Sequence, residues 1–220
     1  MPTILCLETA TTNCSVALER NGNLLAVRED GDKNYSHAEK LHLFIQEVLN
    51  EAKLKPQELD AVAFSMGPGS YTGLRIGAAA AKGLCFSLDI PLISVSTLFS
   101  LAIQIEIPEN AVVVPMLDAR RMEVYSAVFD SNGKQIRETR AEILNENSFS
   151  DYLNAEKVYF LGNGVEKFQQ LMEHPNAVFV LDKFPSARQM LFEAEEKFSK
   201  NQFEDVAYFE PFYLKYFVSR

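Results

Sequence analysis

The pattern of apolar and polar positions in the first half of the chain predicts strands and helices in the order βββαβαβα. The strands are expected at residues 3–7, 14–18, 23–28, 59–64 and 90–95, and the helices at residues 36–52, 70–87 and 97–103. Asn21-Gly22 is typical of a hairpin turn between the second and third strands. Ser36 and Glu39 match the capping box that begins a helix, and apolar residues then follow at helical spacing.

The second half of the chain repeats this order of elements. Residues 111–117 form an apolar strand that ends at Asp118, as residues 3–7 end at Glu8. Further elements match the first half in order: strands at 123–129 and 134–140 around the turn Ser131-Asn132-Gly133, and a strand at 157–161 before Gly162-Asn163-Gly164. Two copies of a βββαβα unit predict two similar α/β lobes, each a mixed sheet flanked by helices, with a cleft between them.

The repeat also predicts the domain organisation. We expect an N-terminal lobe at residues 1–104 and a smaller C-terminal lobe at residues 105–204, the latter ending with a helix from Pro185 to about Phe198. The aromatic tail, residues 205–220, is expected to pack back on the first lobe. No low-complexity linker separates the halves, which favours closely docked lobes.

Composition narrows the class of protein. The net charge of −9 argues against a bare nucleic-acid binder, which would carry a basic face. No apolar run approaches the roughly 20 residues that span a membrane, and the start at Met1-Pro2-Thr3 predicts no signal peptide. Three cysteines without a CxxC motif favour a reduced, cytoplasmic setting with buried thiols.

Residues 65–85, SMGPGSYTGLRIGAAAAKGLC, are unusually rich in small side chains. Glycine inside a helix costs about 0.5–1 kcal/mol relative to alanine, so a close neighbour is expected to explain it. Either a ligand meets the turn at Gly67-Pro68-Gly69, or another backbone meets the face formed by Gly73, Gly77 and Ala81. We predict the second: a docking face for protein, packed against helix 36–52 or against its copy in a partner.

Candidate chemistry is sparse. Glu8 and Asp118 stand at equivalent strand ends, where they could orient a metal-bound water or substrate, or could simply cap their own strands. The loops beside them contain neither a phosphate-binding glycine nor a P-loop motif. His37 and His42 are five residues apart, about 140° around a helix, and cannot share one ion. Ser70 lies outside a G-x-S-x-G elbow. We therefore predict no catalytic and no metal-ligating residue.

Several motifs together resemble the bacterial TsaB (YeaZ) family, in order along nearly the whole chain. They are ILCLETA at 4–10, GPGSYTGLRIG at 67–77, AKGL at 81–84, DARRMEVY at 118–125, FLGNG at 160–164 and PFYL at 211–214. The resemblance implies the actin/sugar-kinase/Hsp70 (ASKHA) fold of two ribonuclease-H-like lobes. One departure is that the family often has Asp where Glu8 stands, which weakens a nucleotide-orienting role there.

The resemblance also implies a function: a non-catalytic, cytoplasmic scaffold subunit in the synthesis of tRNA threonylcarbamoyladenosine. Its implied partners are a TsaD-like transferase, a TsaE-like ATPase and a second copy of itself, with tRNA bound indirectly through the complex and no membrane. No cofactor is expected on the chain alone, and ATP or ADP would belong to the complex interface. Glu8, Thr9, Asp118 and Arg120 would mark a vestigial nucleotide cleft.

Family members dimerise through helices that map here to residues 36–52 and 70–87. The predicted interface residues are His37, Leu41, Phe44, Ile45, Tyr71, Gly73, Leu74, Ile76, Gly77, Ala80 and Ala81.

Considered without the resemblance, the residues leave two enzymatic functions open as alternatives. One is a small ATP-dependent phosphotransferase with Glu8 and Asp118 as its acids. The other is a peptidase of the glycoprotease type, for which the chain offers neither a metal site nor a triad.

Overall fold

A computed structural model of the chain describes residues 2–31 and 37–215, and the chain forms two compact units. The first unit comprises Met1–Thr97 with Pro185–Arg220, and the second comprises Leu98–Phe184. The predicted capping residue Ser36 lies outside the described residues.

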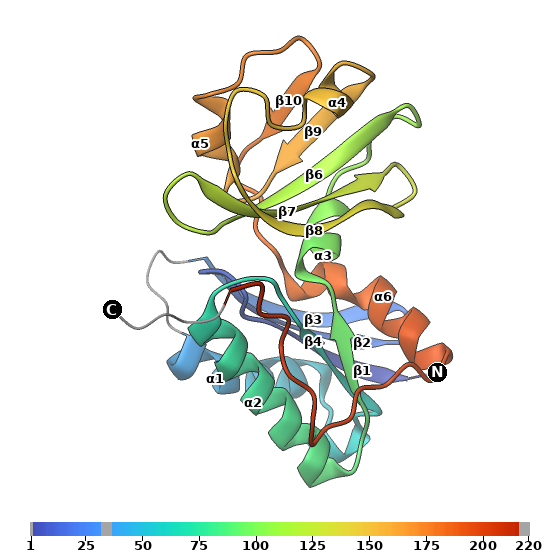
Figure 1. The fold of residues 1–220 in the computed structure, drawn as a ribbon. Coiled ribbons are helices and arrows are strands. Elements are labelled where there is room, and N and C mark those ends of the chain that lie inside the picture. Colours follow the sequence, from blue (N-terminus) through green and yellow to red (C-terminus); the bar gives the residue numbers. More distant parts are fainter. Residues whose placement is uncertain (1, 32–36, 216–220) are drawn as a thin grey trace. The chain divides into compact units, whose positions relative to one another are not determined.

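The first unit contains a five-stranded mixed sheet with the strand order β3-β2-β1-β4-β5 (Figure 1). Its strands are β1 (Thr3–Glu8), β2 (Cys14–Arg20), β3 (Asn23–Asp30), β4 (Ala61–Ser65) and β5 (Leu92–Val95). The first three strands are antiparallel, and β4 and β5 run parallel to β1. This confirms the predicted meander followed by crossover helices.

Helices cover both faces of this sheet, because its central strands are apolar on both sides. Leu5 and Leu7 of β1 face α1 (His37–Ala52) and α2 (Tyr71–Leu88). Ile4 and Cys6, which point the other way, pack with Met190 of α6 (Ala187–Ser199). Figure 1 shows α1 and α2 side by side on one face and α6 on the other.

The second unit repeats the same sheet, with the order β10-β9-β6-β7-β8. Its strands are β6 (Ala111–Asp118), β7 (Glu123–Asp130), β8 (Gln135–Ile143), β9 (Lys157–Leu161) and β10 (Ala177–Val180). Read in reverse, this order is β8-β7-β6-β9-β10, which matches β3-β2-β1-β4-β5 of the first unit strand by strand. The predicted internal repeat is therefore confirmed, although β10 was not predicted.

Short helices cover the second sheet. One face packs on α4 (Ser150–Leu153) and α5 (Val165–Gln169) around the aromatic cluster of Phe149, Phe160 and Phe168. The other face packs on α3 (Thr97–Ala102), whose Leu98 and Leu101 lie among buried residues of β6 and β7.

The compact units divide the chain differently from the predicted lobes 1–104 and 105–204. Residues 98–104 belong to the second unit because α3 buries its apolar side chains against the second sheet. Residues 185–204 belong to the first because Ala187, Met190 and Ala194 of α6 pack on the first sheet. The first unit thus receives α6 from a separate segment of the chain, whereas α3 begins the contiguous segment of the second unit.

The tail is held along the first unit. The backbone N–H of Glu204 donates to Leu92 O on β5, and the N–H of Phe212 donates to Met66 O beside the glycine turn. Phe209 and Tyr213 pack against the core that α1 and α2 share with the sheet. None of the helices described is long and apolar enough to cross a membrane.

Candidate functional site

The inner face of α2 is packed against the loop that follows β1. A Cβ on Gly73 would lie 2.1 Å from Thr9 O, and one on Gly77 would lie 2.3 Å from Thr9 Oγ1 and 2.6 Å from the Phe64 ring. The Thr9 hydroxyl donates to Gly73 O at 2.9 Å. These glycines are required because the β1 loop and β4 occupy the place of a side chain.

This packing corrects the prediction that Gly73, Gly77 and Ala81 form a docking face. All three are buried inside the first unit, and the backbone that approaches them is that of Thr9. The neighbouring helix α1 also borders this face: His37 Cδ2 lies 3.4 Å from the position of a Gly73 Cβ, and Ala81 belongs to the same core cluster as Leu41 and Ile45.

The other predicted interface residues fall into two groups. His37, Leu41, Ile45, Leu74 and Ala80 are also buried in the core of the first unit. Phe44 and Ile76 are half-buried and Tyr71 is exposed. Tyr71 packs on Tyr213 of the tail, with the Arg75 guanidinium 5.4 Å from its ring centre. The helices were predicted correctly, whereas most of the side chains chosen on them face inward.

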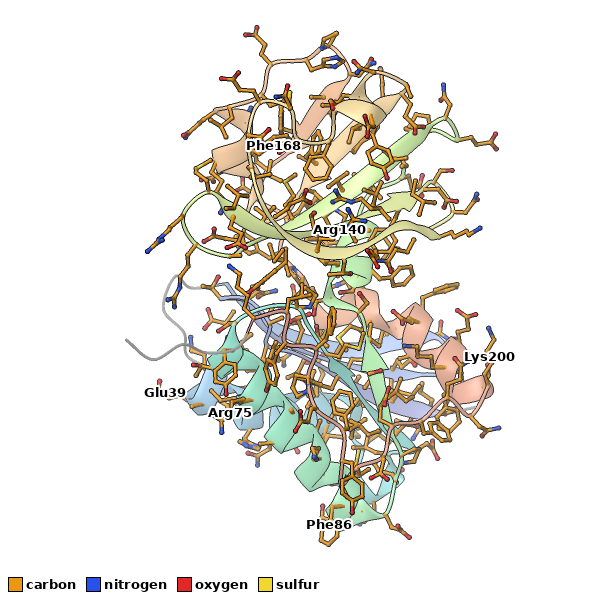
Figure 2. All side chains as sticks on the ribbon, in the orientation of Figure 1. Glu39, Arg75, Phe86, Arg140, Phe168 and Lys200 are labelled. Carbon is orange, nitrogen blue, oxygen red and sulfur yellow. The ribbon has the colours of Figure 1, made fainter. Side chains whose placement is uncertain are left out.

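The outer face of α2 carries a different set of residues. Arg75, Ala79, Gly83 and Phe86 are exposed at helical spacing, and Figure 2 shows Phe86 projecting near the end of the helix. Phe86 is 85% exposed, and a Cβ on Gly83 would meet no atom of residues 2–31 or 37–215 within 4 Å. On α1, Leu43 is 50% exposed. The sequence places Ala79 and Phe86 on one helical face, since they are seven residues or two turns apart, but it does not show that this face is exposed.

The glycine turn before α2 uses its amides within the chain. Gly67 N donates to Thr97 Oγ1, and Ser70 N donates to Ala10 O at 2.7 Å. Gly73 N donates to the Ser70 hydroxyl, which caps the helix. Phe212 O lies 3.0 Å from the position of a Cβ on Gly67. The turn is therefore built into the packing of the first unit, which favours the structural interpretation over an anion site.

Glu8 is fully buried at the end of β1. The Ala10 N–H donates to its Oε1 at 2.6 Å, so the side chain caps the turn that follows its own strand. Burial raises the pKa of Glu8 to about 7, while Ser65 and the amides of Ala10 and Thr9 act in the opposite direction. With Thr9 bonded to α2 as well, this half of the predicted nucleotide cleft is engaged in packing and does not fit a phosphate.

Asp118, the counterpart of Glu8 in the second unit, has a different environment. It is exposed, and its Oδ1 accepts from Lys167 Nζ at 2.5 Å and from Arg120 N at 3.2 Å. Asn163 Oδ1 accepts from Asp118 N. The two acids thus stand at equivalent strand ends, as predicted, but one is buried and the other is ion-paired. A nucleotide site that needs both stays a prediction.

The histidines and cysteines take structural positions. The buried His37 Nε2 lies 2.7 Å from Thr11 O, and burial lowers the pKa of this imidazole. All three cysteines are free and buried, as predicted, and burial raises the pKa of Cys14 to about 12 and that of Cys85 to about 11. Within residues 2–31 and 37–215, no group of three or more His, Cys, Asp or Glu side chains could hold a metal ion.

Two ribonuclease-H-like units with the same strand order, each flanked by helices, define the ASKHA class of folds. The family model described as "TsaD: tRNA N6-adenosine threonylcarbamoyltransferase" matches residues 33–215. The chain belongs to the TsaB (YeaZ) family within this group, as its similarity to curated relatives shows.

Two of those relatives are named tRNA threonylcarbamoyladenosine biosynthesis protein TsaB. The protein from Haemophilus influenzae is 31% identical, covering 97% of this chain and 93% of its own length. The protein from Escherichia coli is 33% identical, covering 96% of this chain and 94% of its own length.

Solved structures agree with this assignment. YeaZ from Pseudomonas aeruginosa superposes with a TM-score of 0.78 at 27% identity, covering 97% of this chain and 100% of that one. A second structure, of an uncharacterized protein with similarity to peptidase YEAZ from the same organism, gives a TM-score of 0.82 at 26% identity, covering 98% of this chain and 100% of that one.

Proposed function

We propose that this chain is a non-catalytic scaffold subunit of tRNA threonylcarbamoyladenosine synthesis, which binds and activates a TsaD-type transferase. The names of its relatives and the match to the TsaD family model support the pathway. The observation that carries the scaffold role is the outer face of α2, where a helical glycine, Gly83, faces open space.

Nothing in the part of the chain that the structure describes explains Gly83. An interior helical glycine costs about 0.5–1 kcal/mol relative to alanine, and nothing near Gly83 would obstruct a methyl group. A partner backbone that approaches the helix at this point would explain why residue 83 is a glycine. Ala79 adds only a methyl group to the same outer face of α2. Phe86 supplies an exposed aromatic side chain of the kind that anchors interfaces.

The partner on this face is the TsaD-type transferase, because the chain matches the TsaD family model and so resembles the partner in fold. In the absence of the transferase, the same face pairs two copies of this chain. A TsaE-like ATPase joins the heterodimer, tRNA is held through the complex, and ATP or ADP binds at the complex interface. The assembly is cytoplasmic.

The test is binding of the full-length chain to the TsaD-type protein of its own organism. Phe86→Glu should weaken the complex by at least about tenfold, because burying such a side chain contributes about 1.5–3 kcal/mol. Gly83→Arg should act in the same direction while the free chain stays folded. Binding measured by calorimetry at wild-type strength for both variants would contradict this surface.

A matched control is Phe192→Glu on α6, which packs on the other face of the same sheet. Phe192 is 68% exposed, so the substitution introduces the same charge at a comparable aromatic position. It should leave the affinity unchanged, and an equal loss would mean that the effect of Phe86→Glu is not local.

The absence of catalysis has its own test. The isolated chain, given ATP and Mg²⁺, should show no turnover that depends on Glu8. Turnover that Glu8→Gln abolishes would instead establish the phosphotransferase alternative.

A further inference from the structure

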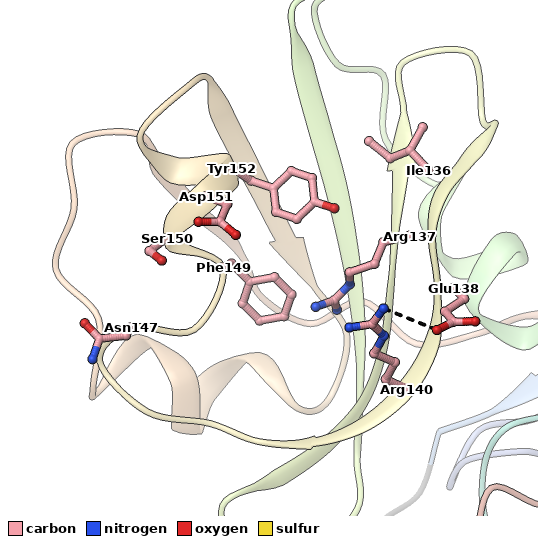
Figure 3. A pocket seen from close by; sticks show the side chains of 9 residues that line it. All are labelled: Ile136, Arg137, Glu138, Arg140, Asn147, Phe149, Ser150, Asp151 and Tyr152. Atoms are coloured by element: carbon pink, nitrogen blue, oxygen red, sulfur yellow. Dashed lines mark hydrogen bonds and ion pairs between the residues drawn. The ribbon is translucent and has the colours of Figure 1, made fainter.

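A pocket of about 600 Å³ lies in the second unit between β8 and the segment 147–152 that leads into α4 (Figure 3). Sites for small ligands have volumes of about 300–1,000 Å³. The pocket is lined by residues of this unit only, and none belongs to α1, α2, the glycine turn or the two strand-end acids. It is a separate feature of the molecule.

An irregularity in β8 shapes one wall of the pocket. Arg137 pairs with Val128 of β7 and Arg140 pairs with Ser126, so three steps along β8 match two along β7. In a regular strand, residues three apart point to opposite faces. The extra residue of this β-bulge places both arginines on the face of Val128 and Ser126.

Arg137 is a fixed part of the wall. Its Nη2 donates to Ser126 Oγ and to Glu142 Oε1, each at 2.6 Å. Its guanidinium also lies 4.6 Å from the centre of the Phe149 ring, and only 13% of the side chain is exposed. Since these contacts occupy one edge of the guanidinium and one of its faces, Arg137 supports the pocket and is not free to follow a ligand.

Arg140 is held far more weakly. Its Nη2 donates to Glu138 Oε1 at 3.2 Å, in a pair whose side chains are 53% and 79% exposed. Exposed pairs of this kind contribute only about 0–1 kcal/mol. Arg140 can therefore turn its planar fork of N–H donors to an incoming anion, for which phosphate and carboxylate have the matching geometry.

The opposite wall offers an acceptor. Asp151 is exposed at the pocket, and no hydrogen bond or ion pair to its carboxylate is found in the part of the chain that the structure describes. Figure 3 shows the rings of Phe149 and Tyr152 between Asp151 and the two arginines. A ligand that reaches both walls must carry an anion at one end, a flat ring in the middle and N–H donors at the other end.

We propose that this pocket binds a nucleotide, with its phosphate on Arg140, its base beside Tyr152 and the N–H donors of the base on Asp151. Guanine fits this arrangement best, because its N1–H and 2-amino group present two adjacent donors to one carboxylate. The nucleotide is either a free mononucleotide or an unpaired nucleotide of an RNA strand. The proposal does not rest on the scaffold function, and either can fail alone.

The experiment titrates the full-length chain with guanosine 5′-monophosphate while backbone amides of the pocket are followed by NMR. Saturable shifts should appear in the segments 136–140 and 147–152. Arg140→Ala should weaken binding by at least about tenfold, as expected for a hydrogen-bonded charge. Shifts confined to other parts of the chain, or an Arg140→Ala variant with unchanged affinity, would overturn the proposal.

The base contact is tested with inosine 5′-monophosphate, which lacks the 2-amino group. Wild type should bind it more weakly than the guanosine nucleotide, and Asp151→Asn should reduce that difference. Equal affinity of wild type for guanosine 5′-monophosphate and ribose 5-phosphate would show that no base is bound and would refute the site.

Two further arms complete the design. Lys157→Ala, which removes an exposed positive charge from β9 of the same unit, should leave binding unchanged. A short unpaired guanosine-containing RNA distinguishes the sources: tighter binding than the mononucleotide indicates an RNA strand, and equal or weaker binding indicates a free nucleotide. If Lys157→Ala weakened nucleotide binding as much as Arg140→Ala, the loss would reflect only the net charge of the protein. That result would contradict the proposed binding site.

Discussion

At the scale of single residues, Glu19 is the most unusual position in the first unit. It lies on β2 opposite Ile4, fully buried, and both of its carboxylate oxygens lack a hydrogen-bond partner among the residues described. Burial, reinforced by the negative charge of Glu195 on α6, raises its pKa from the ordinary 4.5 to about 7. Glu19 is therefore neutral in the folded protein at mildly acidic pH.

This environment predicts a pH-dependent stability. Between pH 4.5 and 7 the folded protein keeps a proton that the unfolded chain releases, so stability falls as the pH rises through this window. The loss from Glu19 amounts to about 3 kcal/mol. Glu19→Gln should therefore match wild type near pH 4 and exceed its free energy of unfolding by that amount near pH 8, as measured by urea denaturation.

The exposed Glu173, in the loop before β10, provides the control for this experiment. Glu173→Gln removes the same charge from a solvated position and should change the free energy of unfolding far less than Glu19→Gln does near pH 8. If Glu19→Gln behaved like this control, the carboxyl of Glu19 would have to be ionised and solvated in the folded state.

At the scale of elements, α2 combines two kinds of glycine. Gly77 meets Thr9 and Phe64 of its own unit, whereas Gly83 faces open space. The sequence shows both only as glycines in a helix, and the regular spacing of Gly73, Gly77 and Ala81 made the inner face look like the docking surface. The difference depends on which loop lies against the helix, and that loop comes from the end of β1.

The two glycines should respond oppositely to alanine. Gly77→Ala places a methyl group 2.3 Å from Thr9 Oγ1 and should lower the free energy of unfolding by about 1–3 kcal/mol. Gly83→Ala should raise it by about 0.5–1 kcal/mol, because only the helix propensity changes. Thermal unfolding of the two variants beside wild type provides the measurement. A destabilised Gly83→Ala would reveal a close contact inside the free chain.

The β8 strand is a second element whose structure could not be fully predicted from the sequence. Alternation along residues 134–140 places Arg137 and Arg140 on opposite faces, and the bulge reverses this for Arg140. A bulge arises from pairing with the neighbouring strand and has no clear signal in QIRETR. The pocket between β8 and α4 could not be predicted for this reason.

At the scale of the whole molecule, the first unit is discontinuous in the chain. Its sheet takes α6 from the segment after the second unit, whereas α3 opens the second unit's own segment. Periodicity shows that each of these helices has an apolar face but not which sheet that face covers, which is why the lobe boundaries at 104 and 204 were misplaced.

This organisation predicts how fragments behave. Residues 98–184 expressed alone should fold cooperatively, because they keep α3 over the second sheet. Residues 105–204 should be less stable, since they lack α3 and expose the apolar face of α6. Circular dichroism melts of the two fragments compare them directly, and a more stable 105–204 fragment would contradict the assignment of these helices.

The sequence by itself determined the order of strands and helices in the first half, the internal repeat and the TsaB family, because these depend on local periodicity, turn residues and contiguous motifs. Only the tertiary structure decided that Gly73 and Gly77 face the β1 loop while Gly83 and Phe86 face solvent. It also decided which sheet α3 and α6 each cover, and where the pocket lies. Those features arise from contacts between residues far apart in the chain, where a side chain's surroundings are set by its neighbours in space.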